Sequence, residues 1–151
     1  MRFIGVDLHK RVLVACVLEI RDGRRVVVAR GTWSCQDGAG LQEFFTRHAP
    51  FQVVVEATAS YEWFAQAVEP LTDRLVLAHP KKLRVIAEST RKTDKLDAQV
   101  LAEFLALGMI PEAHRPTLGV RAHRFHRAFK TGQFACRVRA ADGGAYVVGP
   151  E

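Results

Sequence analysis

The spacing of apolar residues predicts three strands at the start of the chain. Apolar, β-rich runs at 3–6, 12–20 and 25–32 are separated from one another by a few polar residues. The second and third runs flank an Asp-Gly pair at 22–23, which is typical of a tight hairpin turn. The chain is therefore expected to open with one strand followed by a two-stranded hairpin.

Beyond residue 37, helical and strand patterns alternate. The expected helices are 41–48, 61–71, 81–88 and 96–105, and the expected strands between them are 51–55 and 74–78. Thr58 and Ser60 are candidate N-caps for the second helix, and Thr93 for the last. The order β-β-β-α-β-α-β-α-α is that of a ribonuclease-H-like α/β domain, a mixed five-stranded sheet with helices on both faces.

The end of the chain has a different composition. No Asp or Glu occurs between Arg115 and Ala141, a stretch rich in arginine, and no regular period continues beyond Val120. Such a segment is expected to be a basic extension with little regular structure. We therefore predict one domain at 1–110, followed by a basic linker and tail at 111–151.

Composition and charge narrow the class of protein. Hydrophobic residues make up 48% and charged residues 25% of 151 residues, proportions typical of one soluble globular domain. The net charge of +6 favours an acidic partner, of which nucleic acid is the commonest, although a merely basic soluble protein has the same charge. The three cysteines lack metal-ligand spacing, a charge occurs as early as Arg2, and the longest apolar run covers only 12–18. These features predict a cytoplasmic protein that does not cross a membrane.

Four carboxylates are candidate metal ligands. Asp7 and Glu56 come at the ends of two strands expected to be near each other. Asp94 and Asp97 are three residues apart at the expected start of a helix, so they are expected to share one face of that helix. Taken singly, each has an ordinary explanation, such as a strand-end surface residue or a favourable charge at a helix N-terminus. Together they would repel one another without a cation, and their oxygen atoms suit Mg²⁺ or Mn²⁺. Two such ions can promote phosphodiester cleavage.

Basic residues surround the last two of these carboxylates. The candidate phosphate contacts are Lys81, Lys82, Arg84, Arg91, Lys92 and Lys95. The alternative is a solvated basic face of a helix. Tyr61 and Trp63, close to Glu56, could stack on an exposed base, but a core position is favoured for Trp63. His9 and His79 lie near the expected site and are expected to be structural.

Three segments then resemble a known family. They are GVDLHK, VVVEATASYEW and KTDKLDAQVLAEFL, and they are similar to the acidic motifs of the DEDD-type insertion-sequence transposases, some members of which are guided by a bridge RNA. The most specific of them is Lys-Thr-Asp-x-x-Asp-Ala after a basic segment. The resemblance covers about residues 2–120 and implies a RuvC-like domain at 1–110.

The resemblance also implies roles for individual residues. It assigns Asp7, Glu56, Asp94 and Asp97 as the catalytic metal ligands, with Mg²⁺ or Mn²⁺ as the cofactor. It implies DNA, a guide RNA and further copies of the chain as partners, in cleavage and transposition of DNA.

The resemblance ends at about Leu118. Family members continue into a helical connection and a second catalytic domain with a nucleophilic serine, and neither Ser34, Ser60 nor Ser89 matches its place. We therefore expect half of a composite active site that is inactive alone. A non-catalytic DNA- or RNA-binding remnant is the main alternative. An actin-like ATPase or sugar kinase is a weaker one, since its further Gly-rich phosphate loops are not found.

Overall fold

The computed structural model describes residues 1–58, 61–91 and 96–115, with the backbone alone at 90 and 91. The observed elements follow the predicted order, with one added 3-10 turn. The strands are β1 (Arg2–Leu8), β2 (Val12–Arg21), β3 (Arg24–Ser34), β4 (Phe51–Glu56) and β5 (Arg74–Ala78). The helices are α1 (Gly38–His48), α2 (Tyr61–Val68), the 3-10 turn η1 (Glu69–Leu71), α3 (Pro80–Arg91) and α4 (Ala98–Ala106).

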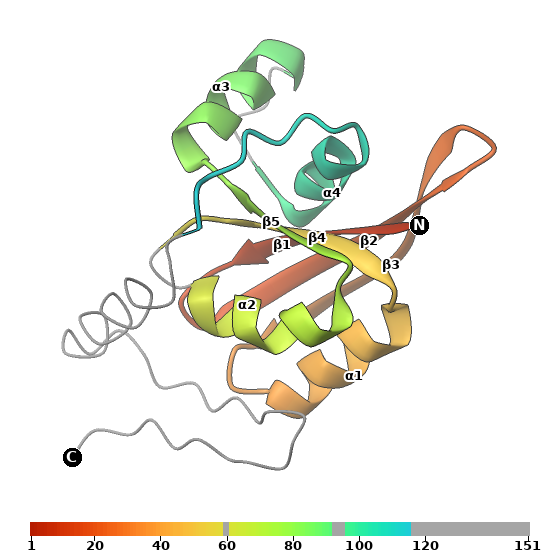
Figure 1. Cartoon of the computed structure of the whole chain (residues 1–151), viewed down its shortest axis with the longest axis vertical. Coiled ribbons are helices and arrows are strands. Elements are labelled where there is room, and N and C mark those ends of the chain that lie inside the picture. Colours follow the sequence, from red (N-terminus) through yellow and green to blue (C-terminus); the bar gives the residue numbers. More distant parts are fainter. Residues whose placement is uncertain (59–60, 92–95, 116–151) are drawn as a thin grey trace.

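The five strands form one mixed sheet in the order β3-β2-β1-β4-β5 (Figure 1). β1 pairs antiparallel with β2, and β2 with β3, whereas β1, β4 and β5 are parallel. The parallel strands are joined by helices, as parallel connections require. The predicted ribonuclease-H-like arrangement, a mixed five-stranded sheet with helices on both faces, is confirmed.

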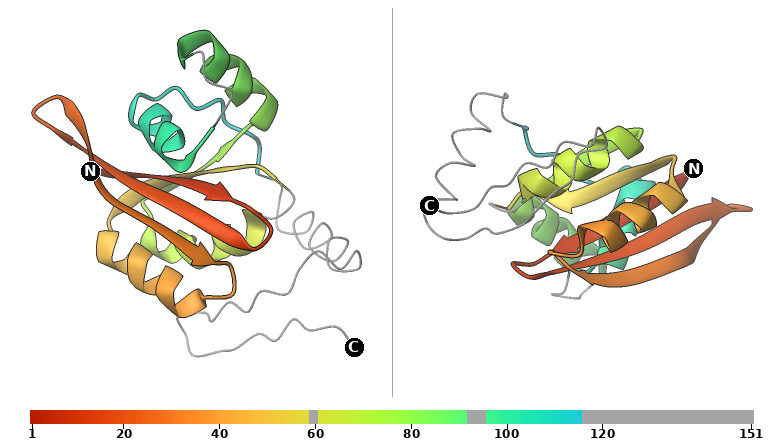
Figure 2. Two further views of the ribbon diagram at one scale, coloured as in Figure 1. Left: turned by 180° about the vertical axis from the view of Figure 1, so that it is seen from behind. Right: turned by 90° about the horizontal axis from the view of Figure 1, so that it is seen from below.

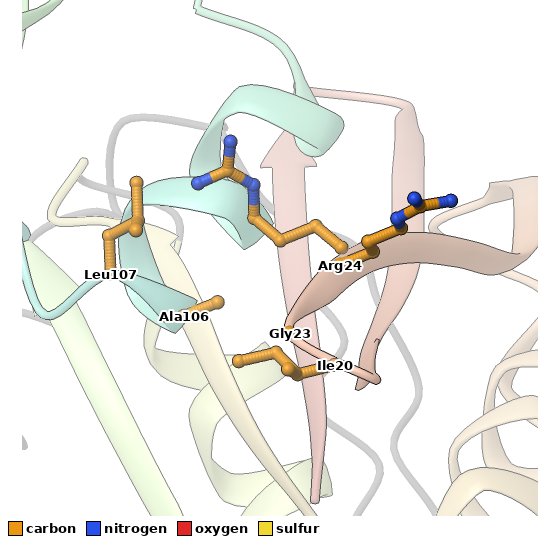
Figure 3. Close-up of a pocket in the computed structure, with 6 residues that line it drawn as sticks. Ile20, Gly23, Arg24, Ala106 and Leu107 are labelled. Carbon is orange, nitrogen blue, oxygen red and sulfur yellow. The ribbon is translucent and has the colours of Figure 1, made fainter.

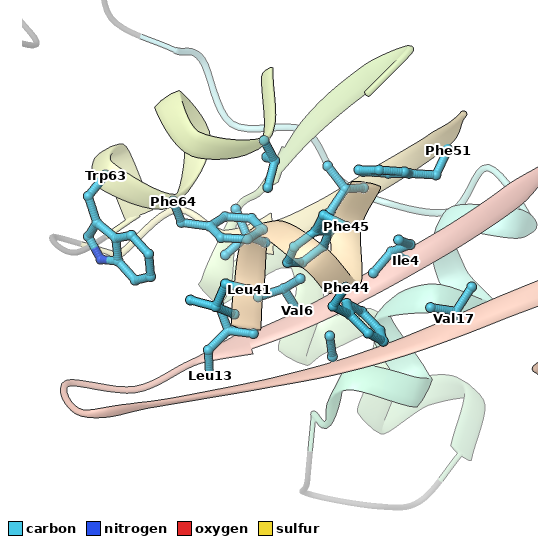
Figure 4. Packing of buried hydrophobic residues seen from close by; sticks show 14 of the residues in the cluster. Ile4, Val6, Leu13, Val17, Leu41, Phe44, Phe45, Phe51, Trp63 and Phe64 are labelled. Atoms are coloured by element: carbon cyan, nitrogen blue, oxygen red, sulfur yellow. The ribbon is translucent and has the colours of Figure 1, made fainter. Parts of the chain in front are cut away.

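Helices α1 and α2 cover one face of the sheet with an aromatic core (Figure 4). Phe45 of α1 is at its centre, with its ring centroid 5.4 Å from Phe44, 5.7 Å from Phe51 and 5.5 Å from Phe64. Trp63 is also buried in this cluster. The core position favoured for Trp63 from the sequence is confirmed, and its indole is not available for stacking on a base.

Helices α3 and α4 pack on the opposite face. Leu83 of α3 and Leu101 of α4 are buried against Val54 of β4 and its neighbours. The axis of α4 lies so close to β1 that a Cβ added to Gly5 would stand 2.0 Å from the Ala98 carbonyl oxygen. Glycine at position 5 is therefore what allows α4 to lie directly on the central strand.

The β2–β3 hairpin projects beyond the rest of the sheet in two opposite views (Figures 1 and 2). Its turn has positive φ at both Asp22 (49°) and Gly23 (72°), the geometry predicted from the Asp-Gly pair. At the other edge, residues 111–115 continue alongside β5, where Glu112 bridges to Ala78 and the Ala113 amide donates to the Leu77 carbonyl at 2.7 Å. Within the ranges that the structure describes, no helix is long and apolar enough to span a bilayer.

Among the boundaries that differ from the sequence prediction, two bear on the candidate site. β1 continues to Leu8 because its antiparallel pairing with β2 runs on through Asp7 and Leu8, so Asp7 is inside the strand rather than after it. The last helix, predicted to be capped by Thr93, begins at Ala98, and the residue that caps it is Asp97.

Candidate functional site

The parallel pairing of β1 with β4 brings Asp7 and Glu56 to one edge of the sheet. The register runs in single steps from Arg2 opposite Phe51 to Val6 opposite Val55. The next step along both strands is Asp7 and Glu56, on strands that are about 4.8 Å apart in a sheet. The sequence prediction that these two strand ends are neighbours agrees with this register.

The electrostatic surroundings of Glu56 identify its neighbours. Burial raises the pKa of the Glu56 carboxyl, the Arg84 guanidinium opposes that rise, and the Asp7 carboxylate adds to it. His9 acts in the same direction as Arg84, lowering the pKa of Glu56. Glu56 is therefore a half-buried acid that shares one small region with another acid and two basic groups.

Asp7 is tied to the turn that follows β1. The carboxylate Oδ2 of Asp7 lies 3.1 Å from Nε2 of His9, and the His9 amide donates to the Val12 carbonyl at 2.9 Å. The side chain of Asp7 is 27% exposed and that of His9 is largely exposed. Solvent, and hence a ligand from solvent, reaches the Asp7 carboxylate, with His9 as its direct partner.

Asp97 lies on the face of the sheet that α3 and α4 cover. Its carboxylate Oδ1 accepts a hydrogen bond from the Val100 amide at 2.9 Å, which makes it the N-cap of α4. The following residue, Ala98, lies against Gly5, which is two residues before Asp7 on the same face of β1.

Asp97 is close enough to Cys16, which is opposite Gly5 in β2, to affect the pKa of its thiol. Burial raises the pKa of this thiol, Arg30 lowers it, and Asp97 raises it further. The negative charge of Asp97 is therefore close to the middle of β1 and β2, on the face that carries Asp7.

The predicted four-carboxylate set is only partly described. Asp94 lies outside the described residues, and Asp97 precedes its helix, so the argument that Asp94 and Asp97 share one helical face does not apply to α4. Within 1–58, 61–91 and 96–115, no three His, Cys, Asp or Glu side chains are grouped closely enough to hold a metal ion. The assignment of Asp7, Glu56 and Asp97 as metal ligands stays a prediction.

The basic residues of α3 begin where β5 ends. Lys81, Lys82 and Arg84 are exposed in the first turns of this helix, which starts at Pro80 on the same edge as Glu56. Lys92 and Lys95 lie outside the described residues, as does the side chain of Arg91. The sequence predicts phosphate contacts for Arg84, whereas its lowering effect on the pKa of Glu56 was not predicted.

Two further polar atoms at this edge have no hydrogen-bond partner among the described residues. They are the hydroxyl oxygen of Thr58, which follows β4, and Nδ1 of His79, which follows β5; both atoms are buried. Thr58 is a candidate N-cap for α2 from the sequence, but its hydroxyl forms no hydrogen bond with the described residues of that helix. Ser60, the other candidate, lies outside the described residues.

The raised pKa of Glu56 gives a prediction about stability and pH. An acid whose pKa is raised by folding stabilises the fold below its ordinary value of 4.5, and this contribution is lost as the pH rises through the raised pKa. Glu56→Gln is therefore expected to raise the Tm at pH 7 and to give no gain below pH 4.5. Thermal unfolding across this range measures the difference.

Glu19 is the matched control, because its pKa moves in the opposite direction. Hydrogen bonds from Arg2 and Arg21 hold the pKa of the Glu19 carboxyl below 4.5, with Arg2 Nε at 2.9 Å. Its contribution is present above that value and is lost as the pH falls through the lowered pKa. Glu19→Gln is expected to lower the Tm at pH 7. Equal shifts of one sign in both variants would contradict the assignment of Glu56.

The chain is similar to a known protein family. A family model described as a transposase, DEDD_Tnp_IS110, matches residues 4–122. No curated protein matches the chain. Among solved structures, a crystal structure of the Aquifex aeolicus Ppx/GppA phosphatase, type II variant, is 10% identical with a TM-score of 0.34; the match covers 60% of this chain and 41% of that one.

Proposed function

The chain belongs to the DEDD transposase family of the IS110 type, and we propose that its carboxylate edge binds divalent metal for cleavage of DNA strands during transposition. The observation that carries this proposal is the parallel register of β1 and β4, which continues to Asp7 and Glu56. The family makes DNA the expected partner. The RuvC-like domain of this proposal is 1–110, and 111–151 is a basic linker and tail whose first residues dock on β5.

The residues at this edge fit a hard divalent cation in chemistry. Asp7 and Glu56 offer carboxylate oxygens on adjacent strands, and the Asp7 carboxylate raises the pKa of Glu56, so the two negative charges oppose each other. A cation between them would relieve that repulsion. One carboxylate oxygen of Asp97 accepts the hydrogen bond from the Val100 amide, and the other can bind a metal ion. Asp94 completes the proposed set of metal ligands.

Mg²⁺ or Mn²⁺, when bound, would polarise the scissile phosphate and lower the pKa of a bound water. The chain's own residues have separate parts in this proposal. Asp7 and Glu56 set the position of the ion by the register of their strands. Arg84 offsets the charge of Glu56 when it faces Glu56, and its guanidinium also offers donors to a phosphate oxygen.

Mg²⁺ is expected to stabilise the protein through this site. An ion that binds only the folded state raises the unfolding free energy by about 2.7 kcal/mol at a concentration 100 times its Kd. Asp7→Asn should abolish most of this gain, because it removes one of the two strand-borne charges. The measurement is the Tm with increasing Mg²⁺ or Mn²⁺.

The control for this experiment is Asp73→Asn. Asp73 is exposed and its amide donates to the Phe51 carbonyl at the start of β4, at the opposite end of the strand from Glu56. This variant should keep the full response to Mg²⁺. If Asp7→Asn keeps it as well, the ion does not bind at the carboxylate edge.

We propose that nucleic acid lies along α3, next to the carboxylate edge. Lys81, Lys82 and Arg84 are exposed there and carry no acidic partner in the ion pairs of the described residues. Arg91, Lys92 and Lys95 extend the proposed phosphate contacts along the sequence. A cationic helix beside a metal site brings a phosphodiester to the ion.

The affinity for duplex DNA is expected to fall steeply with salt. Each phosphate contact adds about −0.9 to the slope of log K against log salt, so replacing Lys81, Lys82 and Arg84 together by Ala should reduce the slope by about 2–3. Fluorescence anisotropy over a salt series measures it. Arg47→Ala, on α1 across the sheet, is the control and should leave the slope unchanged. An unchanged slope in the triple variant would place the DNA elsewhere.

The same proposal includes the other partners of the family and its second catalytic domain. We propose a guide RNA and further copies of the chain as partners, and a serine from a second catalytic domain as the nucleophile that joins DNA strands. Metal ligands position and activate a phosphate, but covalent strand exchange also needs a nucleophile within reach of it. In this proposal the present chain alone is inactive in strand exchange. DNA binding without any response to Mg²⁺ would instead indicate a non-catalytic nucleic-acid-binding protein.

A further inference from the structure

A hollow of about 440 Å³ lies between the β2–β3 hairpin and the C-terminal end of α4 (Figure 3). Its lining residues are Ile20, Gly23, Arg24, Arg25, Ala106 and Leu107. In Figure 3 the side chains of Ile20 and Ala106 point toward one another across it. Because Arg2 pairs with Glu19, Ile20 is beside the N-terminal end of β1, and the hollow is at the opposite end of that strand from Asp7.

Two exposed aliphatic side chains line this hollow, and two more are near its lining residues along the chain or across the sheet. Ile20 and Leu107, which line it, are 49% and 50% exposed. Met1, which is 64% exposed, precedes Arg2, the partner of Glu19, and Met109 is three residues after the end of α4. These four are most of the exposed large hydrophobic residues in the described ranges; the remaining two are Val12 and Val85. Large apolar side chains concentrated at one place on a surface mark an interaction site, and methionine and arginine are enriched in protein–protein interfaces.

The rim of the hollow carries unpaired positive charge. Within 1–58, 61–91 and 96–115, neither Arg24 nor Arg25 forms an ion pair or a side-chain hydrogen bond, whereas Arg2 and Arg21 share Glu19. A guanidinium binds a carboxylate through two parallel hydrogen bonds. Arg25 is opposite Ile20 in the pairing of β2 with β3 and therefore shares its face of the hairpin, whereas Arg24, opposite Arg21, is on the other face. The surface therefore combines an aliphatic floor with one cationic group, Arg25, that is suited to a carboxylate.

We propose that this hollow binds an acidic polypeptide segment of a partner protein. One aliphatic side chain of the segment lies on Ile20, Ala106 and Leu107, and a carboxylate next to it pairs with Arg25. Residues 116–141 of the protein's own tail do not fit, because they contain no Asp or Glu.

Nucleic acid fits this surface less well than a polypeptide does. A phosphate backbone would pair with Arg25, but it would leave the aliphatic floor without an apolar partner. The lining has no aromatic ring on which a base could stack. A side chain such as leucine between two acidic residues satisfies both parts of the surface.

The proposal is tested with a short fluorescein-labelled peptide of two leucines flanked by glutamates. It should bind saturably, and a peptide with serines for the leucines, or lysines for the glutamates, should not. Ile20→Ser and Leu107→Ser should each weaken binding about tenfold or more, the loss expected when one aliphatic side chain leaves an interface. Arg25→Glu should abolish it, whereas Arg24→Glu, on the other face of the hairpin, should weaken it less. Val85→Ser, an exposed valine on α3, is the matched control and should bind as the parent does.

Three outcomes would overturn this proposal. They are no binding of the glutamate–leucine peptide, equal binding of the serine peptide, and displacement of the peptide by duplex DNA in a manner that depends on Leu107. The last would assign the hollow to nucleic acid. Asp7→Asn should bind the peptide normally, so that failure of the metal site and failure of this surface are separate results.

Discussion

Gly5→Ala is expected to destabilise the domain by about 3 kcal/mol, the upper end of the range for overpacking a core. The added Cβ would stand 2.0 Å from the Ala98 oxygen and 2.5 Å from the Ala102 nitrogen, and both are backbone atoms of α4. A helix backbone cannot turn aside as a side chain can, so α4 must move off β1. For a chain of this length the Tm should fall by roughly 10 °C.

Gly31→Ala is the matched control, on the same sheet. A Cβ at Gly31 would also meet an atom too closely, at 1.8 Å, but that atom belongs to the indole of Trp33. Trp33 is only partly buried and its ring can rotate, so the expected cost is nearer 1 kcal/mol. Urea unfolding of both variants measures the costs. A loss at Gly31 as large as at Gly5 would show that the backbone of α4 is not the limiting contact.

The displacement of α4 should also reach the carboxylate edge. Asp97 is adjacent to Ala98, the residue that the new methyl group would strike. We therefore expect Gly5→Ala to weaken the stabilisation by Mg²⁺ under conditions in which the variant is still folded.

The order of strands and helices was predictable because each element has a strong local signal. The buried strands are short apolar runs, the Asp22-Gly23 turn is specific for a hairpin, and Pro50 follows the C-cap residue of α1. Once three antiparallel strands are followed by alternating helices and parallel strands, few sheet topologies remain. The strand ends that carry Asp7 and Glu56 follow from that topology.

The start of α4 was not predictable from local signals. Thr93 and Asp97 are both good N-cap residues. Leu96 fits the helical period, but it precedes the helix and packs against the hydrophobic cluster under α3 and α4. What distinguishes the two positions is the close contact of Ala98 with Gly5, which are 93 residues apart. A contact of this kind is not visible in the spacing of either segment.

The environment of Glu56 was also not predictable. Arg84 is on a helix that begins only after the next strand, and its effect on the Glu56 carboxyl depends on how α3 leaves the sheet. Glu103 is a similar case: it occurs in an apolar helix, yet it is buried, with the Gln99 amide donating to it at 2.8 Å.

The two possible roles of Asp97, helix cap and metal ligand, can be separated with two substitutions. Asparagine caps a helix about as well as aspartate, so Asp97→Asn should retain the bond from the Val100 amide and lose at most about 1 kcal/mol of charge–dipole energy. Asp97→Ala should lose the cap as well, at a further cost of about 1 kcal/mol. If Asp97 is a metal ligand, both variants lose most of the stabilisation by Mg²⁺, although their stabilities without metal differ.

Asp37 provides the control, because it caps α1 in the same way. Its carboxylate Oδ1 accepts from the Gly40 amide at 3.0 Å, on the other face of the sheet from Asp97. Asp37→Ala should cost about as much stability as the loss of the Asp97 cap and should leave the response to Mg²⁺ intact. Urea unfolding with and without Mg²⁺ measures both quantities for all three variants. A full response in Asp97→Asn would show that Asp97 serves the helix alone, and that the ion is held by Asp7 and Glu56 without it.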